Sequence, residues 1–452
     1  MRISWIPILA LALATACPVD DGPPSEGEGE GEGEGEGEGE GEGEGEGEGE
    51  GEGEGEGEGE GEGEGEGEGE GEGEGEGEGE GPPSLAQALT LLRADADAAL
   101  LALSKSHGLP LALDDGTRLF VSTFVDERQL AGDLNGWTPE PMTDEGAFAW
   151  LARAAADGSG YKFTDGSSWL ADPRSRAYTF DAFGEMSQVS RLGFGRERHF
   201  DVGGFGLQAR VVRALVPAGT ISHVLYAHDG QNLFHPDDQT MFGSWHIEAT
   251  VPAGMLVVGI DNTDARMDEY THVADAIPEV VGGQADAYAR LVEEQVRPLA
   301  RRWYGEPGPV GVMGSSLGGL VSMYIADRNP SAWDFVASLS GTLGWGSFAA
   351  GVADGDDTII DLWRGDGRRP FVVYLDSGGQ GAPCADDDGD GIEDDRDGGD
   401  NSCETIQMRD LLLAEGYVDG VDLSYVLDVG AQHNEAAWAA RVGPIMELFA
   451  QQ

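Results

Sequence analysis

A repeat of glutamate and glycine runs without a break from Glu26 to Gly81 and restricts folding to the remainder of the chain. Every second residue carries the same charge and every other residue lacks a side chain, so the segment repels itself and has nothing to bury. We therefore expect residues 18–83 to form an extended, disordered linker. Folded structure is expected only after Pro83.

Residues 1–17 have the organisation of a secretory signal peptide. An apolar run from Ile3 to Ala14, too short to span a bilayer, is followed by two small residues and Cys17. The stretch Ala14-Thr15-Ala16-Cys17 resembles the lipobox of bacterial lipoproteins. That resemblance implies acylation of Cys17 and a membrane partner, with the protein anchored in the bacterial cell envelope. The alternative is ordinary secretion, in which Cys17 has no such role.

The formal net charge of −60 bears on which partners the chain can bind. The chain is acidic beyond the repeat as well, which argues against binding nucleic acid through its phosphates. Strong acidity otherwise bears on solubility and leaves both the chemistry and the oligomeric state open.

Two small regions follow the linker. Residues 84–107 have apolar residues at helical spacing and a Ser-x-x-Gln start, which predict an amphipathic helix. Residues 108–190 change to short strands and turns. Two segments, Gly132-Asp133-Leu134-Asn135-Gly136-Trp137 and the stretch from Tyr161 to Trp169, resemble the early-set immunoglobulin-like β-sandwich of glycogen-binding modules.

In glucan-binding members of that class, two tryptophans and a lysine form the sugar platform, and Trp137, Lys162 and Trp169 occupy those positions here. Flat rings stack on sugar faces and an ammonium donates to hydroxyls. The alternative, which we favour, is that these side chains fill the core of a small sandwich or its boundary with the next domain.

Residues 191–452 alternate between strands and helices. The strands are nearly continuous apolar runs, which indicates a mostly parallel sheet covered by helices on both faces. About 260 residues suffice for one large core. The predicted fold class is therefore α/β, with this sheet preceded by a small all-β domain.

The segment Gly314-Ser315-Ser316-Leu317-Gly318 follows the predicted strand PVGVM and precedes a predicted helix. G-x-S-x-G between a strand and a helix is typical of the nucleophile elbow. Small flanking residues permit the tight turn, and the N–H of Leu317 would face a developing oxyanion. The sequence therefore predicts Ser316 as a nucleophile.

His433 follows the last predicted strand and precedes the last predicted helix. It lies after Ser316 in the chain, as the order Ser, acid, His requires, whereas every other histidine precedes Ser316. We predict that His433 is the general base. The alternative is a histidine that only caps the final helix.

Several segments together resemble the esterase family of α/β-hydrolases that includes enterochelin, feruloyl and acetylxylan esterases and the mycolyltransferases. They are HDGQNLF, VVGIDN, RMDEYTH, GSSLGG, YLDSG and QHNEAAWAARV, spread over residues 195–450. The resemblance implies a second oxyanion donor at the backbone of Gly230 or Gln231. It also places Arg266, Glu269 and Tyr270 near the substrate, although an ion pair that organises a loop is an equal alternative.

The acid of a triad departs from the family pattern, because the expected position after Gly378 is Gly381 and an acidic insertion, residues 381–403, follows. Asp400 recovers the expected position if the insertion is excised. Asp376, at the end of the preceding strand, is the reserve candidate.

The insertion itself resembles the calcium loops of dockerins and thrombospondin-type repeats. Its acidic residues fall at positions 1, 3, 5, 9 and 12 of that pattern, with glycine at position 6, and are Asp386, Asp388, Asp390, Asp394 and Asp397. A structural Ca²⁺ is one interpretation and a solvated acidic loop is the other. Cys384 and Cys403 bracket the loop, and in an oxidising compartment they predict a disulfide.

The function predicted from the sequence is a serine esterase that needs no cofactor for catalysis. Its substrate would be a small-molecule or glycan-linked ester of a carbohydrate, a phenolic acid or a siderophore. The same residues would also serve an acyltransferase, because exclusion of water decides the acceptor. A non-catalytic surface lipoprotein that binds glycan is the third hypothesis.

Overall fold

The computed structural model describes residues 81–235, 243–276, 279–348, 358–381, 383–387, 389–393, 395 and 399–452. The predicted signal peptide, Cys17 and nearly all of the Glu-Gly repeat lie outside these residues. Gly81–Gln452 falls in a single compact unit. Within the described residues, no helix has the length and apolar character needed to cross a bilayer.

Residues 84–107 form two helices, α1 (Leu85–Ala94) and α2 (Ala96–Ser106), so the prediction of one continuous helix is wrong. The break lies at Asp95, whose backbone is extended and whose side chain accepts a hydrogen bond from Ala98 N. A carboxylate that can cap the next helix competes with continuation of the first. The predicted start is present, because Ser84 and Gln87 form a capping box.

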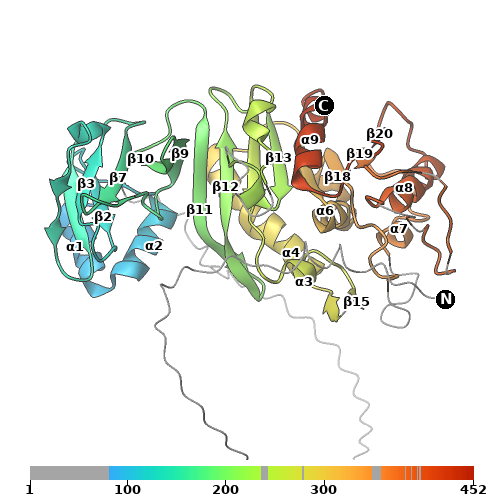
Figure 1. Ribbon diagram of the computed structural model, residues 1–452, viewed down its shortest axis with the longest axis horizontal. Coiled ribbons are helices and arrows are strands. Elements are labelled where there is room, and N and C mark those ends of the chain that lie inside the picture. Colours follow the sequence, from blue (N-terminus) through green and yellow to red (C-terminus); the bar gives the residue numbers. More distant parts are fainter. Residues whose placement is uncertain are drawn as a thin grey trace, which may run out of the picture. The chain divides into compact units, whose positions relative to one another are not determined.

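The two helices cover one side of a small all-β region made of two sheets (Figure 1). Residues alternate along a strand, so Leu119 and Val121 pack on the helices whereas Phe120 packs between the sheets. The first sheet has the order β1 (Leu111–Ala112), β2 (Arg118–Ser122), β6 (Ala149–Arg153), β5 (Thr143–Asp144). The second has the order β9 (Ala177–Asp181), β10 (Gly184–Gln188), β7 (Gly160–Thr164), β3 (Gln129–Gly132), β4 (Glu140–Pro141), and β8 (Trp169–Leu170) pairs with β7. No comparison tests the immunoglobulin-like assignment, which stays a prediction.

The second small sheet continues into the main sheet, because β9 pairs with β11 through Tyr178 and Arg196. The main sheet has the order β11 (Gly195–Gly204), β12 (Leu207–Val216), β14 (Met255–Ile260), β13 (His223–His228), β17 (Val310–Ser315), β18 (Phe335–Leu339), β19 (Val372–Ser377), β20 (Leu423–Leu427). From β14 to β20 every pair is parallel, and β12 is antiparallel to both of its neighbours. The predicted mostly parallel sheet is confirmed.

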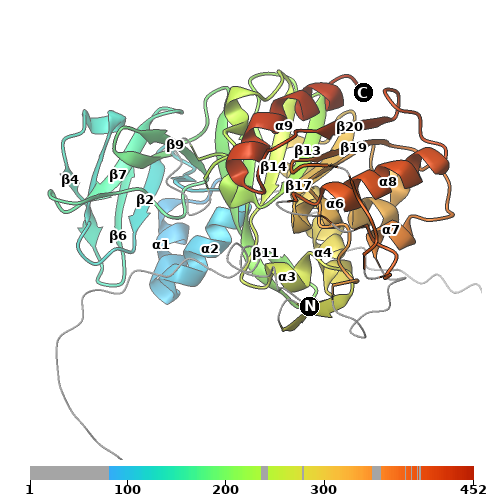
Figure 2. The same ribbon diagram turned by 45° about the vertical axis from the view of Figure 1, so that its right-hand side comes forward.

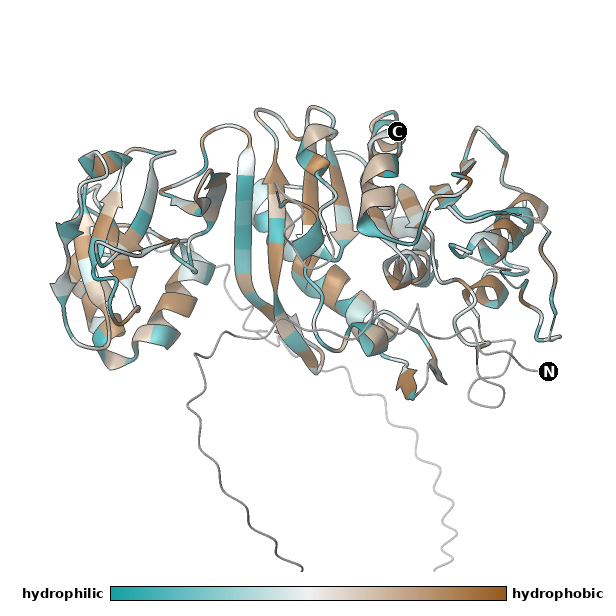
Figure 3. Ribbon diagram, viewed as in Figure 1, coloured by the Kyte–Doolittle hydropathy of each residue, from teal (hydrophilic) through white to brown (hydrophobic). Residues whose placement is uncertain are grey.

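Helices cover both faces of the main sheet, as the apolar strands predicted. Helix α9 (Glu435–Phe449) packs on one face, whereas α4 (Ala285–Leu291), α6 (Leu317–Arg328) and α8 (Ser402–Ala414) pack on the other (Figure 2). Figure 3 shows apolar residues concentrated in the central strands, whereas β11 is largely hydrophilic. Further elements are α3 (Arg266–Glu269), β15 (Ala274–Ala276), β16 (Val280–Gly282), a π-helical turn (Val292–Val296), α5 (Arg297–Tyr304), α7 (Ile359–Leu362) and several short 3₁₀ helices.

Candidate active site

Ser316 lies in the sharp turn between β17 and α6, at φ 56° and ψ −127°. Few residues with a side chain adopt such a backbone, and it holds the hydroxyl at the start of the helix. Glycines make the turn feasible: a Cβ on Gly314 would lie 2.6 Å from the carbonyl carbon of Gly318, and one on Gly319 would lie 2.5 Å from Ser338 Oγ. The elbow predicted from the motif is therefore a close approach of strand and helix backbones.

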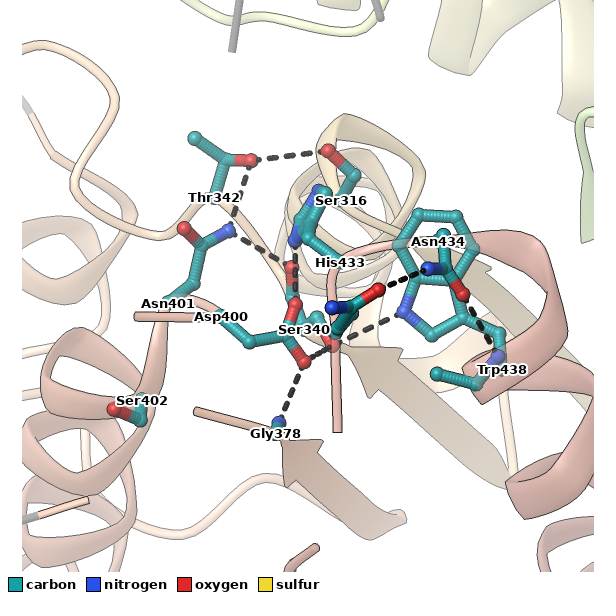
Figure 4. A network of polar contacts seen from close by, with 12 residues as sticks. Ser316, Ser340, Thr342, Gly378, Asp400, Asn401, Ser402, His433, Asn434 and Trp438 are labelled. Carbon is teal, nitrogen blue, oxygen red and sulfur yellow. Dashed lines mark hydrogen bonds and ion pairs between the residues drawn. The ribbon is translucent and has the colours of Figure 1, made fainter. Parts of the chain in front are cut away.

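His433 lies in the loop between β20 and α9, and its Nδ1 is 2.6 Å from Asp400 Oδ1 (Figure 4). The other carboxylate oxygen of Asp400 accepts from Ser340 Oγ and from the N–H of Gly378, each at 2.6 Å. Burial alone would raise the pKa of Asp400, but these hydrogen bonds and the nearby imidazole outweigh burial and lower it. Asp400 is thus held as a carboxylate against the imidazole.

Asp376, the reserve candidate for the acid, has different neighbours. It is fully buried, accepts from Tyr374 Oη at 3.2 Å and lies 3.1 Å from Arg441 Nη2. Burial raises the pKa of Asp376 to about 7, against the opposing charge of Arg441. Between the two candidates, Asp400 is the one that contacts His433.

Ser340, which no sequence motif indicates, connects Asp400 to helix α9. Its Oγ accepts from Trp438 Nε1 at 3.0 Å and from Arg441 Nη2 at 2.8 Å (Figure 4). A hydroxyl has two acceptor positions and one donor, so its proton must point to Asp400. Trp438 also packs edge-on against the His433 ring, with 5.0 Å between the ring centroids.

The Ser316 hydroxyl is partly exposed and makes its hydrogen bond, within the described part of the chain, to Thr342 Oγ1 at 3.4 Å rather than to His433. Thr342 in turn accepts from Asn401 Nδ2 at 3.3 Å. His433 lies between Ser316 and Asp400 in Figure 4. The 3.4 Å hydrogen bond of Ser316 to Thr342 is weak, so the hydroxyl can exchange it for a hydrogen bond to His433. Catalytic hydrogen bonds often shorten only when substrate binds.

Two backbone N–H groups are candidates for an oxyanion hole. Leu317 is the first residue of α6, and Gln231 lies in the short 3₁₀ turn Gly230–Asn232, so neither N–H has a partner inside its own turn. Gly230 is required there, because a Cβ would lie 2.6 Å from the carbonyl carbon of Gly259. Asn262 N donates to Gln231 Oε1 at 3.1 Å and so links this turn to the loop after β14.

Arg266, Glu269 and Tyr270 all bind protein groups around this turn. Arg266 makes two 2.8 Å contacts with the carboxylate of Asp229, the residue before Gly230. Glu269 makes two 2.7 Å contacts with Arg210, and this ion pair is almost completely buried. Tyr270 is fully buried, and its Oη accepts from the N–H of Asp229 at 3.4 Å. These contacts favour the alternative in which the three residues organise a loop.

The candidate sugar platform is partly assembled. The rings of Trp137 and Trp169 lie 6.3 Å apart at 41°, and Trp169 is 39% exposed. Lys162 is buried, and its ammonium is 3.9 Å from Asp181. The two tryptophans therefore form a surface pair, whereas the lysine faces the protein.

Cys384 and Cys403 form the predicted disulfide, with their Cα atoms 5.4 Å apart. Of the predicted calcium ligands, Asp388, Asp394 and Asp397 lie outside the described residues. The carboxylate of Asp386 accepts from the N–H groups of Gly389 and Gly391. Among the residues that the structure describes, no group of three or more potential ligands is assembled. Calcium binding stays a prediction.

Comparison with known proteins places the chain in a family. The model of the family described as "Putative esterase" matches residues 211–445, slightly more than half of the chain. Over 126 aligned residues the chain is 29% identical to the uncharacterized protein YbbA of Bacillus subtilis (strain 168). The alignment covers 26% of this chain and 49% of that protein. The match thus spans about half the length of that curated relative.

Solved structures with some similarity include an esterase and a serine hydrolase. Ferric enterobactin esterase from Salmonella typhimurium is 13% identical with a TM-score of 0.41, over 75% of this chain and 95% of that one. An IroE-like serine hydrolase from Shewanella oneidensis is 16% identical with a TM-score of 0.43, over 56% of this chain and 80% of that one. The match to the family model confirms the family predicted from the motifs: this chain belongs to the Putative esterase family.

Proposed function

We propose that the protein is a serine esterase that hydrolyses a carboxylic ester through Ser316, His433 and Asp400. The observation that carries the proposal is the 2.6 Å contact between His433 Nδ1 and Asp400 Oδ1, beside a serine in a strained elbow. Nδ1 carries a proton in this contact because Asp400 is a carboxylate that only accepts. The neutral imidazole then has its free electron pair on Nε2, where a base for Ser316 is needed.

The reaction follows from these positions. Ser316 Oγ attacks the ester carbonyl carbon while its proton passes to His433 Nε2. The carbonyl oxygen becomes an oxyanion stabilised by the N–H groups of Leu317 and Gln231. Collapse breaks the bond to the alcohol, which leaves with the proton from His433. Water then repeats these steps on the acyl-enzyme and releases the acid, and Asp400 stabilises the imidazolium in both halves.

The substrate proposed is a small-molecule or glycan-linked ester of a carbohydrate, a phenolic acid or a siderophore. The surface pair of the partly buried Trp137 and the exposed Trp169 supports a sugar or an aromatic ring as part of the substrate. A panel of acetylated, feruloylated and siderophore esters would separate these classes.

Replacing the nucleophile tests the proposal. Ser316→Ala should retain its fold and lose hydrolysis of p-nitrophenyl acetate by several orders of magnitude, since triad members act as a unit. Ser315→Ala is the matched control, because Ser315 is the buried last residue of β17. It should keep most of the activity. An active Ser316→Ala enzyme beside an inactive Ser315→Ala enzyme would refute the assignment.

We also propose that the protein is held in the bacterial envelope by a lipid on Cys17, with the Glu-Gly repeat as a spacer. The residues around Cys17 support this. If Cys17→Ser were as membrane-bound as the wild type after cell fractionation, the anchor would lie elsewhere.

A further inference from the structure

A cavity of about 220 Å³ lies apart from the candidate active site and shares no residue with it. Its walls come from the end of α2, the small β region, β11 and the end of α5. The lining residues are His107, Gly108, Leu109, Pro110, Arg118, Arg176, Ala177, Val189, Ser190, Arg191, Glu197, Trp303 and Tyr304.

Arg176 lines this cavity and is only 9% exposed. Its guanidinium stacks on Trp303, with Cζ 3.4 Å from the ring centroid. Gly108 packs on the guanidinium as well, since a Cβ there would lie 2.9 Å from Cζ. One nitrogen, Nη2, donates to Ser104 O at 2.9 Å.

Among the described residues, the rest of this guanidinium has no hydrogen-bond partner. Arg176 Nε is buried without a hydrogen bond, and Arg176 forms no ion pair with any residue that the structure describes. An arginine stays charged in proteins, and a buried charge without a partner is costly. Burial also lowers the pKa of Arg176, although Tyr304 and Glu197 oppose this. A bound anion would offset that cost.

The other charged residues that line the cavity also favour an anion. Arg118 and Arg191 also line it. Glu197 is the one acidic residue among the lining residues, and its carboxylate already contacts Arg191 at 3.1 Å and Tyr304 Oη at 2.8 Å. Arg118 is paired with Asp157 at 3.1 Å, so Arg176 is the lining arginine that has no carboxylate partner among the described residues.

We propose that this cavity binds a small oxyanion, of the phosphate or carboxylate type, against Arg176 with Arg118 and Arg191 at its sides. The planar guanidinium donates in pairs to the oxygens of such groups. The inference does not depend on the esterase activity, because the anion would be held by residues of the small β region and of α5.

The test uses the protein without its signal peptide and titrates inorganic phosphate in one arm and citrate in the other, at an ionic strength held constant with sodium chloride. Calorimetry should record saturable binding at one site per chain in at least one arm, and the melting temperature should rise with that ligand. Binding of phosphate alone, citrate alone or both identifies the type of oxyanion. Absence of heat in both arms at ten-millimolar ligand would overturn the proposal.

Variants assign the site. Arg176→Met should weaken binding about tenfold or more, since it removes charge-assisted hydrogen bonds. Arg290→Gln is the matched control, because Arg290 is exposed and paired with Glu294 outside the cavity. If Arg176→Met does not fold, Arg118→Met and Arg191→Met should each weaken binding severalfold. Wild-type affinity in the folded cavity variants would refute the assignment.

Discussion

Substituting Asp400 by asparagine should invert the tautomer of His433. Asp400 Oδ2 accepts from Ser340 Oγ and from the N–H of Gly378. The backbone N–H cannot become an acceptor, so the amide oxygen of asparagine must take that position. The amide NH₂ then faces His433 Nδ1, where a donor now meets the nitrogen that carried the proton.

The consequence is loss of the general base. Nδ1 must accept from the new amide, the ring proton moves to Nε2, and Nε2 can no longer take the proton of Ser316. In a serine triad, a wrong tautomer of this kind lowers kcat about 10⁴-fold. At about 1.4 kcal/mol per factor of ten, this corresponds to about 5.5 kcal/mol of lost transition-state stabilisation. The fold should persist, because aspartate and asparagine have the same shape.

Asp376→Asn is the matched control, since Asp376 is equally buried, also contacts Arg441 and does not contact His433. The kcat of this variant should stay within about tenfold of the wild-type value. The small loss is expected because asparagine binds Arg441 more weakly than aspartate does. The assay is kcat for p-nitrophenyl acetate at pH 8 with folding checked by circular dichroism. If kcat fell a thousandfold in Asp376→Asn and less than tenfold in Asp400→Asn, the triad acid would be Asp376 and the tautomer argument would be wrong.

Three further outcomes are expected. Ser340→Ala should lower the free energy of unfolding, measured in urea, by about 2–4 kcal/mol, because buried Trp438 Nε1 and Arg441 lose an acceptor, and it should lower kcat/KM about tenfold or more. Ser340→Gly should recover about 1 kcal/mol of stability, because φ is 46° at this position. It should recover no activity, because the hydroxyl is still missing. The contribution of Asp376 to wild-type stability should fall as the pH rises from about 4 to 7, because the pKa of Asp376 is raised to about 7 in the folded protein and is about 3.9 in the unfolded chain. Asp376→Asn should lack this part of the pH dependence in denaturant titrations. Calcium should raise the melting temperature, with Asp386→Asn and Asp390→Asn weakening the effect, and a titration without heat at millimolar Ca²⁺ would contradict the predicted loop.

Much of the fold was predictable because its signals are local. Apolar strands between amphipathic helices indicated a covered parallel sheet, and G-x-S-x-G at a strand end placed Ser316 in a turn that few other sequences permit. The break at Asp95 was missed because the apolar spacing continues across it. There a single carboxylate caps the second helix and overrides that spacing.

The surroundings of Asp400 were only partly predictable. Its place in the chain order and the disulfide at Cys403 indicated where it would lie, because a covalent link three residues away limits how far the acidic insertion can displace it.

Its hydrogen-bond partners come from elements far apart in the sequence. Gly378 follows β19, whereas Ser340 follows β18 and has a positive φ that no motif announces. A serine after an apolar strand is too common to be singled out. Its role depends on Trp438 and Arg441, which α9 brings to the same point about a hundred residues later. Whether a carboxylate can orient an imidazole therefore depends on long-range packing that local patterns do not encode.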